Sequence, residues 1–146
     1  MIGLHGFGRT SEELAAQSRI PTRAIAAGVL GVLPQGSGPE RSWNLAGTTP
    51  NADVAFLSAL VRQWTATECA DPARVVITGI SDGGDMAVFA ACALPGRFRA
   101  VVSASIEPRM GCHPIRMVAV HGDADPVDPY RGKPAAPGYA ATPPAA

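Results

Sequence analysis

Residues 79–83, Gly-Ile-Ser-Asp-Gly, carry the strongest chemical signal in the sequence. The G-x-S-x-G spacing is typical of a nucleophile elbow, in which a strand turns sharply into a helix and exposes the serine hydroxyl. The glycines leave room for the neighbouring strand and helix, and the backbone N–H after Ser81 can point at a developing oxyanion. A plain Gly-Ser turn is the alternative. The β-branched residues 75–78 before the motif and the helical pattern of residues 85–94 after it favour the elbow.

A second signal is the glycine-rich turn at residues 5–8, His-Gly-Phe-Gly. A strand that ends in such a turn can aim a backbone N–H, here that of Phe7, at the same oxyanion. The alternative is an ordinary glycine turn between a strand and a helix. We interpret His5 as a residue that orients the turn rather than as a general base.

The third signal is residues 121–127, His-Gly-Asp-Ala-Asp-Pro-Val, which follow an apolar run. A carboxylate at this place can orient a catalytic histidine and stabilise its imidazolium. Asp125, directly before a proline, is the first choice for that acid, and Asp123 is the second. An ordinary aspartate turn at a strand end is the alternative. Active sites of parallel α/β sheets lie at the carboxyl ends of the strands, where all three signals fall.

Continuous apolar strands that alternate with helices must position these loops. They predict an α/β fold with a parallel sheet flanked by helices. The strands are expected at residues 2–4, 29–33, 74–78, 99–105 and 116–121. The helices are expected at residues 10–28, broken or restarted at Pro21 and closed by Gly28, at 52–67 and at 85–94. Within residues 52–67, an apolar stripe at helical spacing consists of Val54, Leu57, Val61 and Trp64.

Composition limits the possible partners and the size of the domain. The chain has 146 residues with 12 basic and 12 acidic side chains, which gives no electrostatic case for binding nucleic acid or an anionic membrane. No apolar run approaches the roughly 18 residues that span a membrane. A folded domain is expected over residues 1–133, followed by an extended or disordered Pro/Ala-rich tail at 134–146. No metal or organic cofactor is implied.

The three cysteines, Cys69, Cys92 and Cys112, show no metal-ligand spacing. They leave two possibilities open, which are buried free thiols or one disulfide with an odd thiol. A disulfide needs an oxidising compartment. The first ten residues show no signal-peptide hydrophobic region, so the sequence alone gives no localisation.

Six segments follow one another as they do in the polyhydroxybutyrate depolymerase-like esterases, which the chain resembles over about residues 3–132. These segments are LHGFGRT, the WN pair, DVAFLSALV, DPARVVITGISDGGDMAVFAA, FRAVVSAS and HGDADPVDPYRG. This group of α/β-hydrolases includes feruloyl and acetylxylan esterases. The resemblance implies a serine esterase in which Ser81 is the nucleophile and Asp125 the triad acid. It assigns the oxyanion hole to the backbone N–H groups of Phe7 and Asp82.

The same resemblance implies a secreted protein and a disulfide between Cys92 and Cys112. It also implies a substrate that is a small ester, or an ester within a polyester or attached to a polysaccharide. Two other hypotheses stay open. One is a generic carboxylesterase or dienelactone-type hydrolase of the same fold, and the other is a non-catalytic fragment or binding module.

The chain departs from the resemblance at the general base. Triad residues of this fold occur in the order serine, acid, histidine. No histidine follows Asp125, because His5, His113 and His121 all precede it. His113 and His121 are minor candidates for a substitute base, so no triad histidine is identified. The expectation is therefore an α/β-hydrolase domain truncated at both ends, whose activity is in question.

Asp82 is a second departure, because similar esterases often carry an amide residue after the serine. Only the backbone N–H is needed at this position. A nearby carboxylate nevertheless opposes a developing oxyanion unless it points away.

Overall fold

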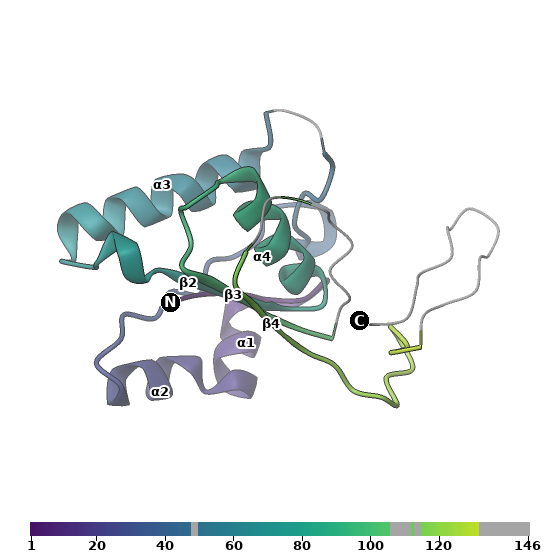
Figure 1. Ribbon diagram of the computed structural model, residues 1–146. Helices are drawn as coiled ribbons and strands as arrows, with labels where there is room; N and C mark the ends of the chain where they lie inside the picture. Colours follow the sequence, from purple (N-terminus) through teal and green to yellow (C-terminus); the bar gives the residue numbers. More distant parts are fainter. Residues whose placement is uncertain (48–49, 106–111, 113–114, 132–146) are drawn as a thin grey trace.

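The described part of the chain forms one four-stranded parallel sheet with helices on both faces (Figure 1). The computed structural model describes residues 1–47, 50–105, 112 and 115–131. The strands are β1 (Ile2–Leu4), β2 (Val76–Ile80), β3 (Ala100–Ala104) and β4 (Met117–Val120), in that spatial order. The α-helices are α1 (Ser11–Ser18), α2 (Ile20–Ala26), α3 (Ala52–Thr67) and α4 (Asp82–Ala93), and short 3-10 turns lie at Pro39–Arg41 and Pro72–Arg74.

The predicted α/β fold with a parallel sheet is confirmed. In Figure 1, α3 and α4 cover one face of the sheet, and α1 and α2 lie against the other. The register pairs Leu4 with Gly79, Ile80 with Ala104, and Ala104 with Val120. The carboxyl ends of the four strands therefore lie at one edge, where the three loops singled out by the sequence emerge.

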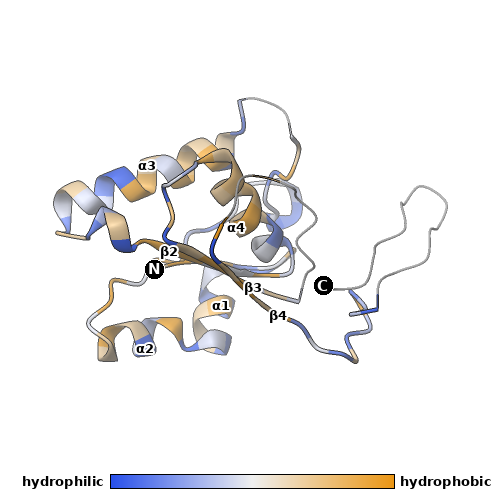
Figure 2. Cartoon of the chain, in the orientation of Figure 1, coloured by the Kyte–Doolittle hydropathy of each residue, from blue (hydrophilic) through white to orange (hydrophobic). Residues whose placement is uncertain are grey.

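The core lies between the sheet and the two helices α3 and α4. Leu4, Ile77 and Val101, from three neighbouring strands, are fully or almost fully buried. Leu57 and Val61 of α3 belong to the same cluster, as the predicted apolar stripe requires. Figure 2 shows β2, β3 and most of α4 in the colours of apolar residues. Burial of each such aliphatic side chain stabilises the fold by about 1.5–3 kcal/mol.

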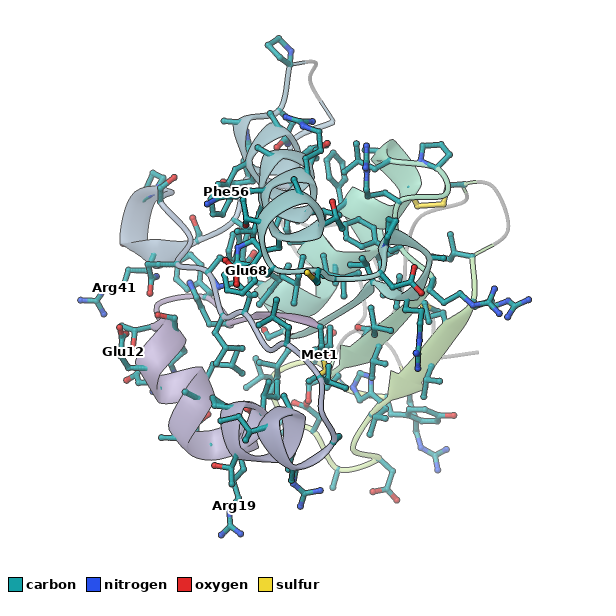
Figure 3. The ribbon with its side chains drawn as sticks, turned by 90° about the vertical axis from the view of Figure 1, so that its left-hand side faces the viewer. Met1, Glu12, Arg19, Arg41, Phe56 and Glu68 are labelled. Carbon is teal, nitrogen blue, oxygen red and sulfur yellow. A yellow bond between two sulfur atoms is a disulfide. The ribbon has the colours of Figure 1, made fainter. Side chains whose placement is uncertain are left out.

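The helix expected at residues 10–28 is two helices. Thr10 caps α1, because its Oγ1 accepts a hydrogen bond from the N–H of Glu13 (3.1 Å) and its own N–H donates to Glu13 Oε2 (2.9 Å). Arg19 then takes a left-handed conformation (φ 56°), and α2 restarts with Pro21 in its first turn, where a proline is tolerated. In Figure 3, the side chains of Glu12 and Arg19 extend outward from this pair of helices.

The prediction of a strand at residues 29–33 is wrong. Only Val32 pairs with β1, through a single bridge to Ile2, and Val29 and Leu30 are 43% and 39% exposed. The segment runs along the outer edge of β1, where it has one neighbouring strand. Gly31 in its middle has no side chain to pack, which weakens a strand. Its apolar residues therefore cover the edge of the sheet instead of extending it.

Two boundaries also differ from the prediction around the G-x-S-x-G motif. The strand β2 ends at Ile80 rather than at residue 78, and α4 begins at Asp82 rather than at residue 85. Only Ser81 separates them. Residues 79–84, which the prediction left between the strand and the helix, therefore form a direct passage from one to the other.

Cys92 of α4 forms a disulfide with Cys112, as the family resemblance implies (Figure 3). Cys69 is a free, exposed thiol. In the part of the chain that the structure describes, no helix combines the length and the apolarity needed to cross a membrane. The tail at residues 134–146 and the boundary at residue 133 lie outside that part.

Candidate active site

Ser81 sits at the sharp passage from β2 to α4 in a conformation that residues with side chains rarely adopt (φ 53°, ψ −127°). Its N–H donates to the carbonyl oxygen of Ala104 at the end of β3 (2.9 Å). Its own carbonyl oxygen accepts from the N–H groups of Gly84 (2.7 Å) and Asp85 (3.0 Å). The neighbouring strand and the helix thus hold this backbone conformation, which has the geometry of a nucleophile elbow.

The glycines around Ser81 are required by close backbone contacts. A Cβ at Gly79 would collide with the backbone of Gly83 in the first turn of α4. A Cβ at Gly83 would collide with the carbonyl oxygens of Leu4 and His5. The two glycines therefore let β2, α4 and β1 approach more closely than side chains would allow.

The turn after β1 lies directly against the elbow. A Cβ at Gly6 would lie 3.5 Å from the Cβ of Ser81 and 3.4 Å from the carbonyl oxygen of Ile80. Phe7 follows with an exposed ring. Asp82 is the first residue of α4, and the first N–H groups of a helix have no acceptor within it. The structure therefore brings the segments that carry the N–H groups of Phe7 and Asp82 together at Ser81, as an oxyanion hole requires.

His5 is completely buried, and both of its ring nitrogens bind nearby groups. Nε2 accepts from the N–H of Gly36 (2.9 Å) and lies 2.8 Å from the side-chain nitrogen of Gln35. Because Nε2 is an acceptor, Nδ1 carries the proton and donates to the carbonyl oxygen of Gly6 (2.9 Å). This arrangement fits the predicted role of orienting the turn and leaves no nitrogen to act on Ser81.

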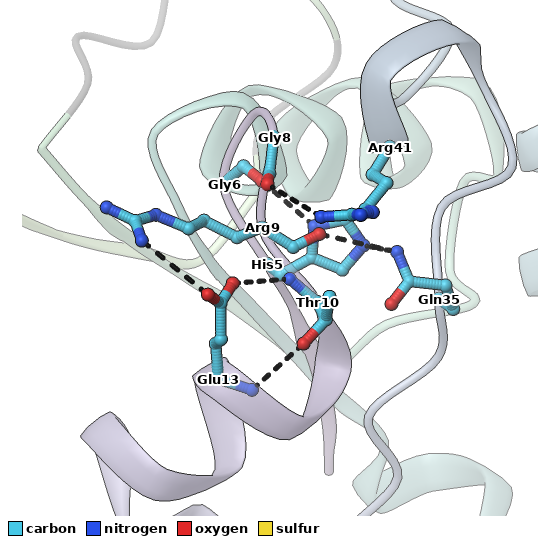
Figure 4. A network of polar contacts seen from close by, with 8 residues as sticks. All are labelled: His5, Gly6, Gly8, Arg9, Thr10, Glu13, Gln35 and Arg41. Atoms are coloured by element: carbon cyan, nitrogen blue, oxygen red, sulfur yellow. Dashed lines mark hydrogen bonds and ion pairs between the residues drawn. The ribbon is translucent and has the colours of Figure 1, made fainter.

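Figure 4 shows the polar network that holds the outer side of the turn. Gln35 donates to the carbonyl oxygen of Arg9, and Arg41 donates to that of Gly8, both at 3.4 Å. Arg9 Nη1 lies 3.7 Å from Oε1 of Glu13, which belongs to the α1 capping box. The turn is thereby connected to α1 on one side and to the loop before α3 on the other.

The carboxylate of Asp82 binds the backbone of a loop that sequence reasoning did not assign to the site. Asp82 Oδ2 accepts a hydrogen bond from the N–H of Trp43 (2.9 Å). Burial raises the pKa of this carboxyl group, and the bond from Trp43 acts against that rise. Trp43 stands in the WN pair of the family resemblance. That pair is the sequence signal that pointed to this loop, although it gave no role.

This environment predicts how Asp82→Asn changes the pH dependence of stability. Because the folded-state pKa lies above the ordinary value of about 3.9, the folded protein binds the proton more tightly than the unfolded chain. The contribution of Asp82 to stability is therefore fully present below that value and is lost as pH rises through the folded-state pKa. The amide does not titrate, so the variant gains stability relative to the wild type over that interval. Urea unfolding of both proteins at a series of pH values measures the difference, and a constant difference contradicts the prediction.

The loop after β4 brings Asp125 and His121 close to each other. Asp125 Oδ1 accepts from the N–H groups of Val127 (2.9 Å) and Asp128 (3.0 Å), and Oδ2 lies 4.0 Å from His121 Nε2. His121 Nε2 donates to the carbonyl oxygen of Asp128 (2.6 Å). Two strand spacings separate the ends of β2 and β4, which is about 10 Å. His121 is therefore engaged within its own loop.

Two further candidates from the sequence are Asp123 and His113. Asp123, the second choice for the acid, is exposed in the same loop. His113 lies outside the described residues. Among the residues that are described, no three His, Cys, Asp or Glu side chains are grouped as a metal site requires.

Comparison with known proteins places this geometry in a family. The model of the prolyl oligopeptidase family matches residues 26–106, which is more than half of the chain and includes the elbow. The protein named "Putative esterase NocK" of Nocardia uniformis subsp. tsuyamanensis is 34% identical over 149 residues, covering 92% of this chain and 42% of its own. "Probable feruloyl esterase C" of Aspergillus flavus is 35% identical over 142 residues, covering 90% and 50%.

The chain therefore spans about half the length of these curated relatives or less. Among solved structures, the crystal structure of esterase PE8 superposes with a TM-score of 0.62 at 21% identity, covering 88% of this chain and 70% of the other. These matches confirm the predicted fold and the resemblance to esterases. The narrower likeness to polyhydroxybutyrate depolymerases stays a prediction. The chain belongs to the prolyl oligopeptidase family and has an α/β-hydrolase fold.

Proposed function

We propose that the chain carries the nucleophile and the oxyanion hole of a serine ester hydrolase, with Ser81 as the nucleophile. The observation that supports this is the strained conformation of Ser81, held directly against the turn that carries Phe7. Ser81 Oγ would attack the ester carbonyl carbon, and the N–H groups of Phe7 and Asp82 would stabilise the oxyanion. Loss of the alcohol would leave an acyl-serine, which water then hydrolyses to the acid.

Asp125 is the proposed triad acid, on the strength of its position after β4 and the family resemblance. An acid at this place orients an imidazole and stabilises its positive charge. Neither described histidine supplies that imidazole, because His5 uses both ring nitrogens in the turn and His121 is bound to Asp128. Without a general base, a serine hydrolase keeps binding and oxyanion stabilisation but loses about 10⁴–10⁶ in rate.

The proposed substrate is an ester of a small carboxylic acid, because the relatives that match most of the chain are named esterases. A feruloyl ester, a polyester, or an ester attached to a polysaccharide are the narrower candidates. A generic carboxylesterase or dienelactone-type hydrolase would instead prefer short nitrophenyl esters. The disulfide between Cys92 and Cys112 supports a secreted protein, since such bonds persist in oxidising compartments.

Labelling with a fluorophosphonate tests the nucleophile. Because neither described histidine activates Ser81, we expect the reagent to add slowly, once to the folded protein, at Ser81 by peptide mapping, and not at all to Ser81→Ala. Ser105→Ala is a matched control, because Ser105 also follows a strand and also has a positive φ (56°). Its labelling should equal that of the wild type. Absence of label from the folded wild type, or label at another residue, would favour the non-catalytic module and overturn the proposal.

A further inference from the structure

Trp43 lies between the two segments that form the proposed oxyanion hole. Its backbone N–H donates to the side chain of Asp82, at the start of α4 (2.9 Å). Its indole Nε1–H donates to the carbonyl oxygen of His5, in the turn after β1 (2.9 Å). Trp43 is almost completely buried, and its ring lies 5.1 Å from that of His5, centroid to centroid. One residue thus connects the elbow with the turn, although 77 positions separate His5 from Asp82.

The loop that carries Trp43 is itself held in place at several points. The next N–H, of Asn44, donates to Asp53 Oδ2 in the first turn of α3 (2.7 Å). Two consecutive peptide N–H groups therefore bind carboxylates from the starts of two different helices. On its other side, the N–H of Gly36 donates to the His5 ring (2.9 Å). The hydrogen bonds made by Gly36 and Asn44, on either side of Trp43 in the chain, fix the position of the loop. Trp43 can therefore hold the groups that it binds in place.

We propose that the side chains of Asp82 and Trp43 form a clamp that holds the N–H groups of Phe7 and Asp82 in register over Ser81. The clamp rests on the proposed function, because it deepens the role of the same site. It assigns Asp82 two tasks, in which the backbone N–H binds the oxyanion and the carboxylate positions the opposite segment. Because the carboxylate is bound to the Trp43 backbone, it is held by a partner instead of opposing the oxyanion freely.

Such a clamp places the two oxyanion donors precisely. Oxyanion donors act only when they lie at hydrogen-bond distance from the charge that develops, and a displacement of about 1 Å can cost a factor of 100 in rate. Phe7, whose N–H is the proposed donor, is exposed, so its side chain does not fix the turn against the elbow. The hydrogen bond from Trp43 to His5 supplies that connection two residues before Phe7.

The test compares Asp82→Ala and Trp43→Phe with Asp82→Asn, which keeps an oxygen acceptor for the Trp43 N–H. We expect fluorophosphonate labelling of Ser81 to slow roughly 10- to 100-fold in Asp82→Ala and Trp43→Phe, and to slow several-fold less in Asp82→Asn than in Asp82→Ala. Hydrogen exchange of residues 5–9 should be faster in Asp82→Ala and unchanged in Asp82→Asn. Asp71→Ala is the matched control, because it also removes a carboxylate bound to a backbone N–H, that of Ala73, but far from Ser81 in the 3-10 turn before β2. Its labelling rate should not change.

Two outcomes overturn the clamp. The first is labelling of Asp82→Ala at the wild-type rate, and the second is equal slowing of Asp82→Asn and Asp82→Ala, which would assign the effect to charge rather than to positioning. Failure of the proposed function gives a different result, in which no protein is labelled, including the wild type. In that case, hydrogen exchange tests the clamp independently of the proposed function. Faster exchange of residues 5–9 in Asp82→Ala supports it, and exchange equal to the wild type overturns it.

Discussion

Gly83→Ala is expected to destabilise the fold severely, by about 3 kcal/mol or more in the free energy of unfolding. The added methyl group would collide with the carbonyl oxygens of Leu4 and His5. Both are backbone atoms at the end of β1, so no side-chain rotation can relieve the overlap. Either α4 must move away from the sheet or the turn after β1 must move away from Ser81. Urea unfolding followed by circular dichroism measures the loss.

Gly47→Ala is the control for this prediction. Apart from its chain neighbours, no described residue places an atom within 4 Å of an added Cβ at Gly47, so the substitution should change stability by less than about 0.5 kcal/mol. The comparison separates the cost of crowding from the general effect of replacing glycine with alanine. Equal stabilities of the two variants would contradict the close packing of α4 on β1.

The elbow could be predicted from the sequence because its determinants are local. The glycines, the β-branched strand before them and the helix after them lie within about 20 consecutive residues, and each points to the same structure. The strand at residues 29–33 could not be distinguished from an edge segment in this way. Its apolar residues are those of a strand, and only the position of β1 at the edge of the sheet decides how much of it pairs.

The clamp lay beyond sequence reasoning for a different reason. The bond between Asp82 and Trp43 joins residues 39 positions apart, and its donor is a backbone N–H, which every residue except proline carries. Nothing in the identity of either residue predicts that pairing. The sequence singled out Asp82 as an unfavourable charge beside the oxyanion, and only the position of the loop showed that its carboxylate has a partner.

The hydrogen bonds within the loop that carries Asp125 could not be predicted from the sequence either. The sequence correctly placed an aspartate after a strand at the edge of the sheet that carries Ser81. It could not show that Asp125 Oδ1 already binds the N–H groups of Val127 and Asp128, as in the ordinary aspartate turn that is the alternative interpretation of this motif. The only imidazole that the described residues place near Asp125 Oδ2 is that of His121, at 4.0 Å, and this histidine is bound to Asp128. The role of Asp125 therefore stays a prediction.

Ser81→Gly is expected to raise the free energy of unfolding by about 1 kcal/mol over Ser81→Ala while both variants lose all reactivity toward fluorophosphonate. Ser81 and an alanine in its place are strained at φ 53° and ψ −127°, whereas glycine adopts such angles readily. Urea unfolding of both variants and the wild type measures this. Ser105→Gly compared with Ser105→Ala, at φ 56°, shows how much of the gain any left-handed residue gives. If glycine is no better than alanine at residue 81, the elbow is not strained. If glycine is better, the serine at residue 81 lowers the stability of the fold. A hydroxyl that acts as a nucleophile explains why a serine occupies this position, whereas a plain turn does not.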